Sequence, residues 1–394
     1  MHFVLSVNVG SSGIKFALFK PNGPHPREAV RGSFKNIGQG TGMFTHAQNG
    51  VKSEEELSFK NHTDAILHLS HWIKKTFATP VYCIAHRLVH GGDKYYRPSF
   101  ITVGLMEGLK ECIPLAPDHL PNALVAIETL ELLFPDVPQV ACFDTCFHQQ
   151  LPPVAKTLPV GNLPAMPQLH RYGFHGISYE YICGQLKELY PHFTDKRIVI
   201  AHLGNGASMA AVKHGHSIDT TMGFTPMGGL LMGSRSGDVD PGVLLYLLQH
   251  GYTTEKLNEL INHQSGLKGV SGLSSNMQVL LDNMANPAAK LAVDMFCYQA
   301  KKHLGALIAA LGGIDILVFT GGIGDAAAPI RSAICSGMDF AGIAIDETLN
   351  GSNSPTIAHA HSKVAIHVLT TNEEIQLAQH ALALLKPSHK HTNE

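Results

Sequence analysis

Apolar and polar residues follow two patterns along the chain, and the two patterns favour different elements. Short apolar runs, typical of buried strands, occur at residues 3–7, 14–19, 81–85, 140–143, 314–320 and 363–369. Longer segments that suggest helices occur at 62–77, 121–134, 178–190 and 287–311. The last is the clearest helix: it ends at Gly312-Gly313, and one of its stripes holds Leu291, Met295, Tyr298, Lys302 and Gly305. Strands that alternate with helices predict an α/β fold.

The turn between the first two strands has the composition of a phosphate-binding loop. It runs Asn8-Val9-Gly10-Ser11-Ser12-Gly13-Ile14-Lys15. Small residues let backbone N–H groups approach an anion, and Ser11, Ser12 and Lys15 add further donors. An ordinary Gly/Ser hairpin turn is the alternative interpretation of this segment taken alone.

A second turn of the same design lies near mid-chain. Residues 197–212 form an apolar run, the turn Leu203-Gly204-Asn205-Gly206, and another apolar run. Setting Gly10 on Gly204 superposes the flanking strands, which predicts an internal duplication with one phosphate-binding hairpin in each of two domains. A third glycine turn, Gly321-Gly322-Ile323-Gly324-Asp325, follows the strand predicted at 314–320 and is neither a Walker P-loop nor a Rossmann fingerprint.

Composition narrows the class of protein. A chain of 394 residues suggests two or three domains of about 150 residues each. A net charge of −2 argues against a nucleic-acid surface, and seven cysteines with no C-x-x-C pair favour a reducing compartment. No basic leader precedes the first strand and no apolar stretch reaches about 18 residues, so we expect an unprocessed cytoplasmic protein without a membrane partner. Residues 151–167 are expected to form an ordered loop between domains, and the tail after Pro387 is expected to be mobile.

The sequence does not favour a dedicated metal site or the chemistry of a serine or cysteine hydrolase. The pairs His68/His71 and His86/His90 have the spacing of metal ligands, but no third ligand follows in a recognisable pattern. The chain has no G-x-S-x-G elbow, and its cysteines near His148 are more typical of buried thiols than of nucleophiles.

Polar residues just past predicted strands, or in glycine-bounded loops, mark the positions where ligands gather in α/β proteins. They are Arg87 after 81–85, Asp144 after 140–143, His175 in a Tyr-Gly-Phe-His-Gly segment, and Arg235 in the loop 232–241. For each residue alone, a salt bridge or a cap is the commoner explanation. Together with two phosphate hairpins, they predict phosphoryl transfer.

The order of these motifs resembles the acetate and propionate kinase family. The family patterns N-x-G-S-S-S-x-K, H-R-x-V-H-G-G, L-A-P-x-H, F-D-T-x-F-H, Y-G-F-H-G-x-S, H-L-G-N-G-x-S, M-G-x-R-S-G-D-x-D-P, G-G-I-G-E-N and T-N-E-E correspond in order to residues 8–15, 86–92, 115–119, 143–148, 172–178, 202–208, 232–241, 321–325 and 371–374. The resemblance implies the sugar kinase, Hsp70 and actin (ribonuclease H-like) superfold, with two duplicated domains around a central nucleotide cleft. It implies an N-terminal domain at 1–145, a nucleotide-binding and dimerisation domain at 146–374, a C-terminal helix at 375–394 that returns to the first domain, and a homodimer.

The reaction implied by the resemblance is reversible in-line transfer of the ATP γ-phosphoryl group to acetate, with Mg²⁺ or Mn²⁺ as metal and no phosphoenzyme. A carboxylate acceptor is ionised at neutral pH and needs no general base. Arg87 and Arg235 would neutralise the anions, and His175 would donate to the transferring phosphoryl group. Asp144 would orient an arginine or a metal-bound water, and His119 would be a supporting hydrogen-bond donor. The other implied roles are a metal environment of Asn8 and Glu373, an acyl pocket of Val89, Phe174 and Pro226, and nucleotide contacts from Ser11, Lys15, His202, Leu203, Gly204, Asn205, Gly206, Asn276, Met277, Gln278, Gly322, Ile323, Gly324, Asp325 and Ala326.

Four departures from the family pattern bear on substrate choice. Gly13 replaces a serine, Asn276-Met277-Gln278 replaces Asp-Phe-Arg, Asp325-Ala326 replaces Glu-Asn, and Asp118, which we expect to turn outward, replaces an apolar residue. The open alternatives are a propionate or butyrate kinase and a relative that uses pyrophosphate. A non-enzymatic nucleotide-binding relative is a weaker alternative, because the charged site residues are all present.

Overall fold

The computed structural model describes residues 2–23, 25–161, 163, 166 and 169–386. The chain divides into two compact units. The N-terminal unit comprises the described residues of Met1–Cys146 and Asn372–Glu394, and the C-terminal unit those of Phe147–Thr371. The expected mobile tail and part of the 151–167 loop lie outside the described residues. The rest of that loop contains the short helix α4 (Pro153–Lys156).

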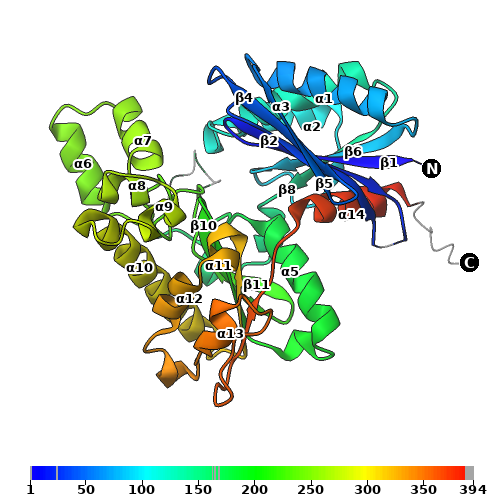
Figure 1. Cartoon of the computed structure of the whole chain (residues 1–394). Coiled ribbons are helices and arrows are strands. Elements are labelled where there is room, and N and C mark those ends of the chain that lie inside the picture. The colour runs from blue at the N-terminus through cyan, green and yellow to red at the C-terminus, as the bar shows by residue number, and fades with distance from the viewer. Residues whose placement is uncertain (1, 24, 162, 164–165, 167–168, 387–394) are drawn as a thin grey trace, which may run out of the picture. The chain divides into compact units, whose positions relative to one another are not determined.

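The N-terminal unit is built on one mixed sheet (Figure 1). Its strand order is β5-β4-β3-β2-β1-β6-β8-β7. The strands are β1 (Phe3–Val9), β2 (Gly13–Lys20), β3 (Arg27–Lys35), β4 (Gly42–Gln48), β5 (Val51–Leu57), β6 (Val81–Leu88), β7 (Ser99–Phe100) and β8 (Gln139–Phe143). The helices are α1 (His62–Thr76), α2 (Val103–Glu111), α3 (Leu120–Leu133) and α14 (Glu373–Leu385). α3 and α14 pack against β1 and β6, which carry the first glycine turn and Arg87.

The C-terminal unit has a smaller mixed sheet with helices around it. Its strand order is β11-β10-β9-β12-β13. The strands are β9 (Ile198–Leu203), β10 (Ala207–Lys213), β11 (His216–Thr220), β12 (Ile316–Thr320) and β13 (Ala365–Val368). Besides α4, the helices are α5 (Gly176–Leu189), α6 (Pro241–Gln249), α7 (Thr254–His263), α8 (Gly266–Ser271), α9 (Met277–Leu281), α10 (Pro287–Leu311), α11 (Gly321–Ala326), α12 (Ala328–Cys335) and α13 (Glu347–Gly351).

The two sheets repeat one topology. In the N-terminal unit, β1, β2 and β3 form an antiparallel meander, and β6 and β8 then extend the sheet parallel to β1. In the C-terminal unit, β9, β10 and β11 form the meander, and β12 and β13 extend the sheet parallel to β9. The expected α/β fold with an internal duplication is therefore confirmed. Each unit has a glycine turn at the tip of its first hairpin.

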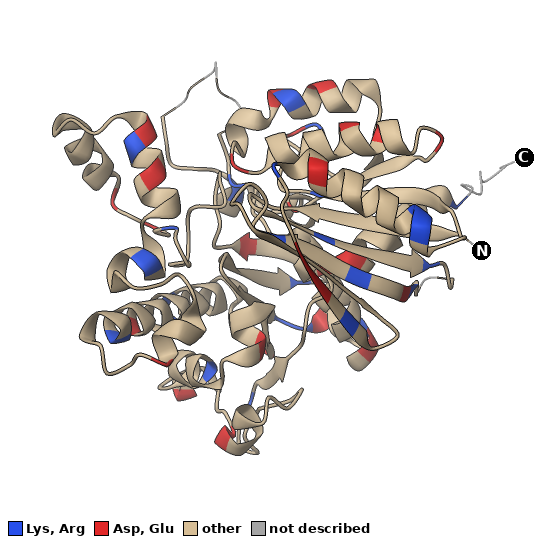
Figure 2. Ribbon diagram, turned by 45° about the horizontal axis from the view of Figure 1, so that its top comes forward, with Lys and Arg blue, Asp and Glu red and all other residues tan. Residues whose placement is uncertain are grey.

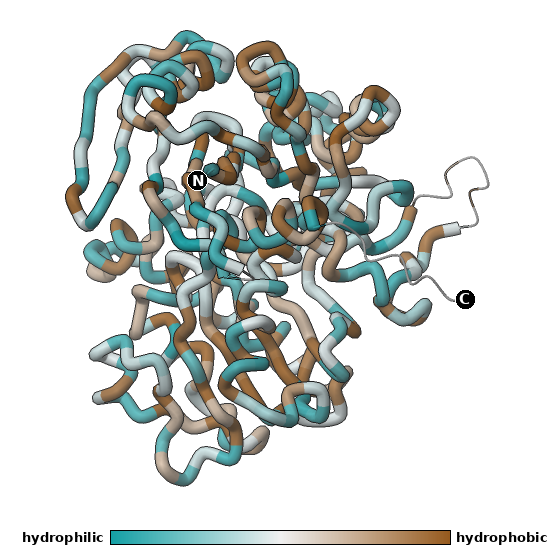
Figure 3. The backbone as a smooth tube through the Cα atoms, turned by 90° about the vertical axis from the view of Figure 1, so that its right-hand side faces the viewer, coloured by the Kyte–Doolittle hydropathy of each residue, from teal (hydrophilic) through white to brown (hydrophobic). Residues whose placement is uncertain are grey.

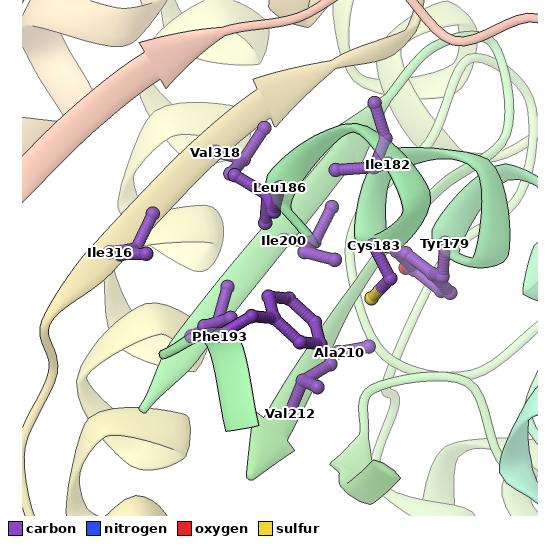
Figure 4. Packing of buried hydrophobic residues seen from close by; sticks show 11 residues of the cluster. Tyr179, Ile182, Cys183, Leu186, Phe193, Ile200, Ala210, Val212, Ile316 and Val318 are labelled. Atoms are coloured by element: carbon purple, nitrogen blue, oxygen red, sulfur yellow. The ribbon is translucent and has the colours of Figure 1, made fainter. Parts of the chain in front are cut away.

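The core of the C-terminal unit is formed by apolar residues at helical spacing on α5 and at alternate positions on the strands that it covers (Figure 4). On α5, Tyr179, Ile182, Cys183 and Leu186 follow the i, i+3, i+4, i+7 spacing of one helix face. This face covers alternate residues of the neighbouring strands, namely Ile198 and Ile200 on β9, Ala210 and Val212 on β10, and Ile316 and Val318 on β12. Apolar stretches in Figure 3 likewise follow the strands. Tyr179 brings a phenol oxygen into this otherwise apolar cluster.

Helix α10 has the predicted bounds, but its inward face is not the stripe identified from the sequence. Leu291 and Tyr298 of that stripe are 54% and 66% exposed. The buried face instead contains Ala292, Phe296 and Leu304, among others. The sequence stripe therefore marks an outward apolar surface.

The cysteines lie mostly in the interior and form no disulfide. Six of the seven are buried, and Cys146 is half-buried. Burial raises the pKa of Cys83, Cys183, Cys297 and Cys335 to about 12, so these thiols stay protonated and unreactive at neutral pH. Within the described residues, no helix has the length and apolarity needed to cross a bilayer.

Two buried histidines make stability depend on pH. Burial lowers the pKa of both His86 and His148 to about 4, because each imidazole is held neutral inside its unit. The unfolded pKa is about 6.5, so the unfolded chain binds more protons between these two values. Stability is therefore fully present above pH 6.5 or so and falls as pH decreases, by up to about 1.4 kcal/mol per pH unit for each histidine.

Thermal melts from about pH 7 to about pH 5 test this expectation. The His148→Gln variant should show a shallower loss of Tm than the wild type, whereas His216→Gln, which replaces an exposed histidine, should not. A wild-type Tm that stays constant over this range would contradict the prediction.

Candidate active site

A charged cluster forms where β6 and β8 end in the N-terminal unit. Arg87 donates from Nε and Nη2 to the two oxygens of Asp144, at 3.2 and 2.5 Å. Its Nη1 donates to Asn8 Oδ1 at 3.2 Å, and its Nε lies 3.8 Å from Glu373 Oε2. Asn8 Nδ2 donates in turn to Glu373 at 3.2 Å. Four of the predicted site residues thus come together, although they are as much as 365 positions apart in sequence.

Strand register explains this convergence. Asn8 on β1 lies opposite Arg87 on the parallel strand β6, and Arg87 lies opposite Cys142 on β8, two residues before Asp144. Glu373 begins α14, which packs on β1 and β6. Burial alone would lower the pKa of Arg87, but the charges of Asp144 and Glu373 outweigh it and raise this pKa, so the guanidinium remains protonated. The cluster is a fixed cation with two carboxylates close to it.

The first glycine turn is as tight as its sequence predicts. Gly10 N–H donates to Gly13 C=O at 2.8 Å, and β1 pairs with β2 on either side. Ser11 and Lys15 are exposed, and Lys15 lies opposite Asn8 in the register. A Cβ on Gly13 would lie 2.8 Å from the Phe34 carbonyl oxygen. The position therefore has no room for the serine of the family pattern without a backbone shift.

The second turn carries a different set of donors. Gly204 N–H donates to Gly206 C=O at 3.1 Å. A Cβ on Gly206 would lie 2.9 Å from Arg235 Nη2 and 3.4 Å from His175 Nε2. Arg235 Nη1 donates to the Pro226 carbonyl at 2.6 Å. The turn therefore has two nitrogen-bearing side chains packed closely against Gly206, where a side chain would collide with the Arg235 guanidinium.

The loop that carries Arg235 is fastened to the same turn. Gly233 N–H donates to the Asn205 carbonyl at 2.9 Å, and a Cβ on Gly233 would clash with the Asn205 side chain. The same Cβ would also lie only 3.1 Å from the Ser275 carbonyl oxygen. Gly233 is thus required by close packing, and it brings the segment before α9 next to the turn.

Two histidines stack beside this turn. The rings of His175 and His202 have centroids 4.3 Å apart and planes inclined by 22°. His175 precedes α5 with φ +60°, an uncommon left-handed conformation for a non-glycine residue. Its Nδ1 contacts Ser208 Oγ at 2.8 Å, and His202 Nδ1 contacts Ser178 Oγ at 2.8 Å. Strained backbone held by specific contacts is typical of functional positions.

Three residues predicted to contact the nucleotide, at 276–278, make local interactions around α9. Asn276 caps α9 by accepting from Gln278 N–H, Met277 is buried, and Gln278 Nε2 donates to Asp282. The backbone just before this segment packs close to the loop of Arg235, since a Cβ on Gly233 would lie 3.1 Å from the Ser275 carbonyl oxygen.

The third glycine turn opens α11. Gly321 has φ +80°, and a Cβ there would meet the Leu203 carbonyl at 2.7 Å; a Cβ on Gly204 would lie 4.0 Å from Gly322 N. Gly322 therefore lies beside the second turn. Burial raises the pKa of Asp325 to about 6, and its Oδ1 finds no hydrogen-bond partner within the described residues. Ile323 and Gly324 belong to the same short helix, and Ala326 ends it.

The predicted acyl-pocket residues are apolar and mostly buried, and each is placed within its own unit. Val89 is 6% exposed and follows β6 two residues after Arg87, and Phe174 is 1% exposed next to His175. Pro226 is half-buried and accepts from Arg235. His119 is half-buried at the start of α3.

The oxygen donors beside Arg87 suit a divalent metal. Mg²⁺ is typically held by one or two carboxylates together with substrate phosphates and water. The carboxylate of Glu373, with its side chain 16% exposed, and the amide oxygen of Asn8 match this donor set. No group of three His, Cys, Asp or Glu side chains among the described residues could hold a metal alone. A metal held here would therefore take its remaining oxygens from substrate and water.

Sequence reasoning missed the hydroxyl groups behind the two histidines. Ser178, Tyr179 and Ser208 are fully buried and contact the imidazole rings directly or through one another. Ser178 and Ser208 do occur at the ends of two recognised motifs. The position of each serine at the end of a recognised motif was the signal available in the sequence.

Comparison with known proteins agrees with this picture. A model of the Acetokinase family matches residues 3–379. An acetate kinase of Acaryochloris marina is 40% identical over 395 aligned residues, which cover 95% of this chain and 98% of the relative. The crystal structure of Porphyromonas gingivalis acetate kinase matches with a TM-score of 0.88 and 36% identity, covering 98% of this chain and all of that one. A propionate kinase from Francisella tularensis matches with a TM-score of 0.90 and 34% identity, covering 97% and 100%. The chain belongs to the acetokinase family.

Proposed function

We propose that this protein is an acetate kinase that transfers the γ-phosphoryl group of ATP directly to acetate. The observation that carries the proposal is the presence, in one acetokinase chain, of two arginine clusters at strand ends: Arg87 among carboxylates, and Arg235 with His175 at a glycine turn. Bringing together anions, rather than activating a nucleophile, is the main task of such a reaction.

Each residue has a role that follows from its charge and surroundings. Arg87 is pinned by Asp144, so its guanidinium can meet the acceptor carboxylate without reorganising. Arg235 and His175 present donors to the oxygens of the transferring phosphoryl group. The backbone of 203–206 and of Gly322 to Asp325 offers phosphate-binding donors in the C-terminal unit, and Ser11 and Lys15 offer them in the N-terminal unit. His119 is a supporting hydrogen-bond donor.

Asn8 and Glu373 would hold Mg²⁺, or Mn²⁺ in its place, because their oxygens form the hard donor set that these ions prefer. The bound metal neutralises phosphate charge. The reduced, mostly buried cysteines favour a cytoplasmic location.

Acyl phosphate formation tests the proposal. The purified protein is mixed with ATP, Mg²⁺ and acetate, propionate or butyrate, and the product is trapped with hydroxylamine; GTP and pyrophosphate replace ATP in parallel. We expect acetyl hydroxamate with ATP, less product with propionate and little with butyrate. Product formed with pyrophosphate but not with ATP, or a preference for butyrate, would contradict the proposal.

Val89 is expected to limit the acyl chain. It is buried two residues beyond Arg87, so it can bound the end of the substrate that the arginine holds. Because one methylene is worth about 1–3 kcal/mol of discrimination, Val89→Ala should raise kcat/KM for propionate relative to acetate by about tenfold. Steady-state kinetics with both acids check this, and KM for ATP should not change.

Val81→Ala is a matched control, since Val81 is also 6% exposed and begins β6. An unchanged propionate-to-acetate ratio in Val89→Ala, or the same change in Val81→Ala, would remove Val89 from the acyl pocket.

We infer that the protein is a homodimer formed through α6 and the outer face of α10. No residue of α6 is buried, and Val243, Leu245, Tyr246 and Leu248 are 41–61% exposed. Leu291 and Tyr298 on α10 are also exposed. An apolar helix of this kind normally packs against another surface. α6 carries no charged residue (Figure 2), so two copies of it can meet without like-charge repulsion.

A charge placed on this helix should prevent association. We expect Leu245→Glu to be monomeric by light scattering after gel filtration, whereas the wild type and Leu132→Glu are dimeric. Leu132 is 83% exposed on α3 of the other unit and makes a matched control. A monomeric wild type, or a dimeric Leu245→Glu variant, would refute the interface.

A further inference from the structure

Two adjacent residues of α5 hold the two stacked imidazoles from behind. Ser178 contacts His202 Nδ1, and Tyr179 reaches His175 Nδ1 through Ser208. Ser178, Tyr179 and Ser208 are all fully buried. The Nδ1 atoms therefore face the protein interior. His175 Nε2 lies on the Gly206 side, where Arg235 Nη2 also lies. Which nitrogen carries the proton in each ring decides what that ring offers to a ligand.

The proton on His202 follows from the hydrogen bonds of Ser178. Ser178 Oγ donates to Thr371 Oγ1 at 2.9 Å. A hydroxyl has a single proton, so the 2.8 Å contact with His202 Nδ1 is one in which the imidazole donates and the serine accepts. A neutral His202 then has its proton on Nδ1, and its Nε2 is an acceptor.

The hydrogen bonds behind His175 favour the other neutral tautomer, with the proton on Nε2. Tyr179 O–H and Ser208 Oγ are 2.5 Å apart, and a phenol, being the stronger acid, is the better donor of the two. Ser208 then directs its own proton to His175 Nδ1, at 2.8 Å. The remaining proton of neutral His175 is on Nε2. This N–H and the Arg235 guanidinium are both donors beside Gly206, which suits an anionic oxygen.

We propose that Tyr179 and Ser208 are positioning residues that hold His175 in its Nε2–H form, while Ser178 and Thr371 hold His202 in the opposite, Nδ1–H form. The stacked pair thus offers one imidazole donor and one imidazole acceptor. The catalytic consequence rests on the proposed function: of the two neutral forms of His175, the Nε2–H form is the one that can donate to the transferring phosphoryl group.

Nitrogen NMR of the wild-type protein labelled with ¹⁵N-histidine reads the tautomers directly. His175→Gln and His202→Gln variants identify the two rings by the loss of their signals. We expect His175 to be protonated at Nε2 and His202 at Nδ1. The same tautomer in both rings would overturn the proposal, and this outcome does not depend on any enzymatic activity.

The Tyr179→Phe variant tests the positioning role, because the ring stays in the core and only the hydroxyl is lost (Figure 4). We expect mixed tautomers at His175. The kcat should fall by about tenfold, because the transition state loses stabilisation comparable to one hydrogen bond. The KM values should stay within about twofold of the wild type.

Tyr181→Phe is the matched control, since Tyr181 lies on the same helix and its hydroxyl accepts from Gln185 outside this network. If Tyr179→Phe matches Tyr181→Phe in both tautomer and kcat, Tyr179 has no positioning role. If the wild type forms no acyl phosphate, the proposed function fails, and the NMR result still decides the tautomers.

Discussion

Replacing Arg235 with alanine is expected to lower kcat by about two to three orders of magnitude, the scale for loss of a preorganised donor at developing charge. Arg235 is half-buried, and its guanidinium is held beside Gly206 and on the Pro226 carbonyl. Its loop is fastened through Gly233 and Asn205, so the backbone should keep its place without the side chain. Steady-state kinetics and a thermal melt of the purified variant check both statements.

Arg87→Ala should show a kinetic loss of similar size, together with a loss of stability. The substitution removes the two hydrogen bonds and the ion pair that Arg87 makes with Asp144, whose side chain is 1% exposed, and breaking a buried ion pair costs about 3–5 kcal/mol. The double variant Arg87→Ala/Asp144→Asn should recover stability but not activity. Arg197→Ala, which removes a half-buried pair with Asp315 distant in sequence from the predicted site residues, is the control and should keep nearly full activity. Near-wild-type turnover in folded Arg87→Ala or Arg235→Ala would exclude that arginine from the mechanism.

The second large effect is expected at His175. If this imidazole donates to the phosphoryl group in the transition state, His175→Ala should lower kcat by about two orders of magnitude and change KM much less. The Nε2 position beside Arg235 and the left-handed backbone at this residue motivate the prediction. His216→Ala, at an exposed histidine of the same unit, should behave as the wild type. A phosphohistidine formed and discharged at this position at the rate of turnover would contradict the donor role.

The sequence predicts most of the fold because its buried strands are continuous apolar runs with turn residues between them. The hairpins β1–β2 and β9–β10 and the strands β6, β8 and β12 all lie where these runs indicate. It does not reveal β5, whose sequence VKSEEEL is almost wholly exposed at the edge of the sheet, where pairing with β4 alone determines the structure. It also does not identify α6, because an apolar helix without a polar face has no helical periodicity to detect.

For the candidate active site, the sequence identifies the glycines and the charged residues, but not the buried hydroxyl groups that hydrogen-bond to the histidines. Arg87, Asp144, His175 and Arg235 stand out because each follows a strand or lies among glycines. Tyr179 and Ser208 do not, since a buried tyrosine at helical spacing and a serine in a strand have ordinary structural explanations. Only the three-dimensional contacts reveal that both hydroxyls lie behind His175.

The central claim is direct transfer of a phosphoryl group from ATP to acetate, and the stereochemistry at phosphorus tests it most directly. ATP made chiral at the γ-phosphorus with oxygen isotopes is turned over with acetate and the wild-type protein, and the configuration of the acetyl phosphate is determined. A single in-line displacement inverts the phosphorus, so the account predicts inversion. Retention of configuration would require an intermediate phosphoenzyme and would contradict it.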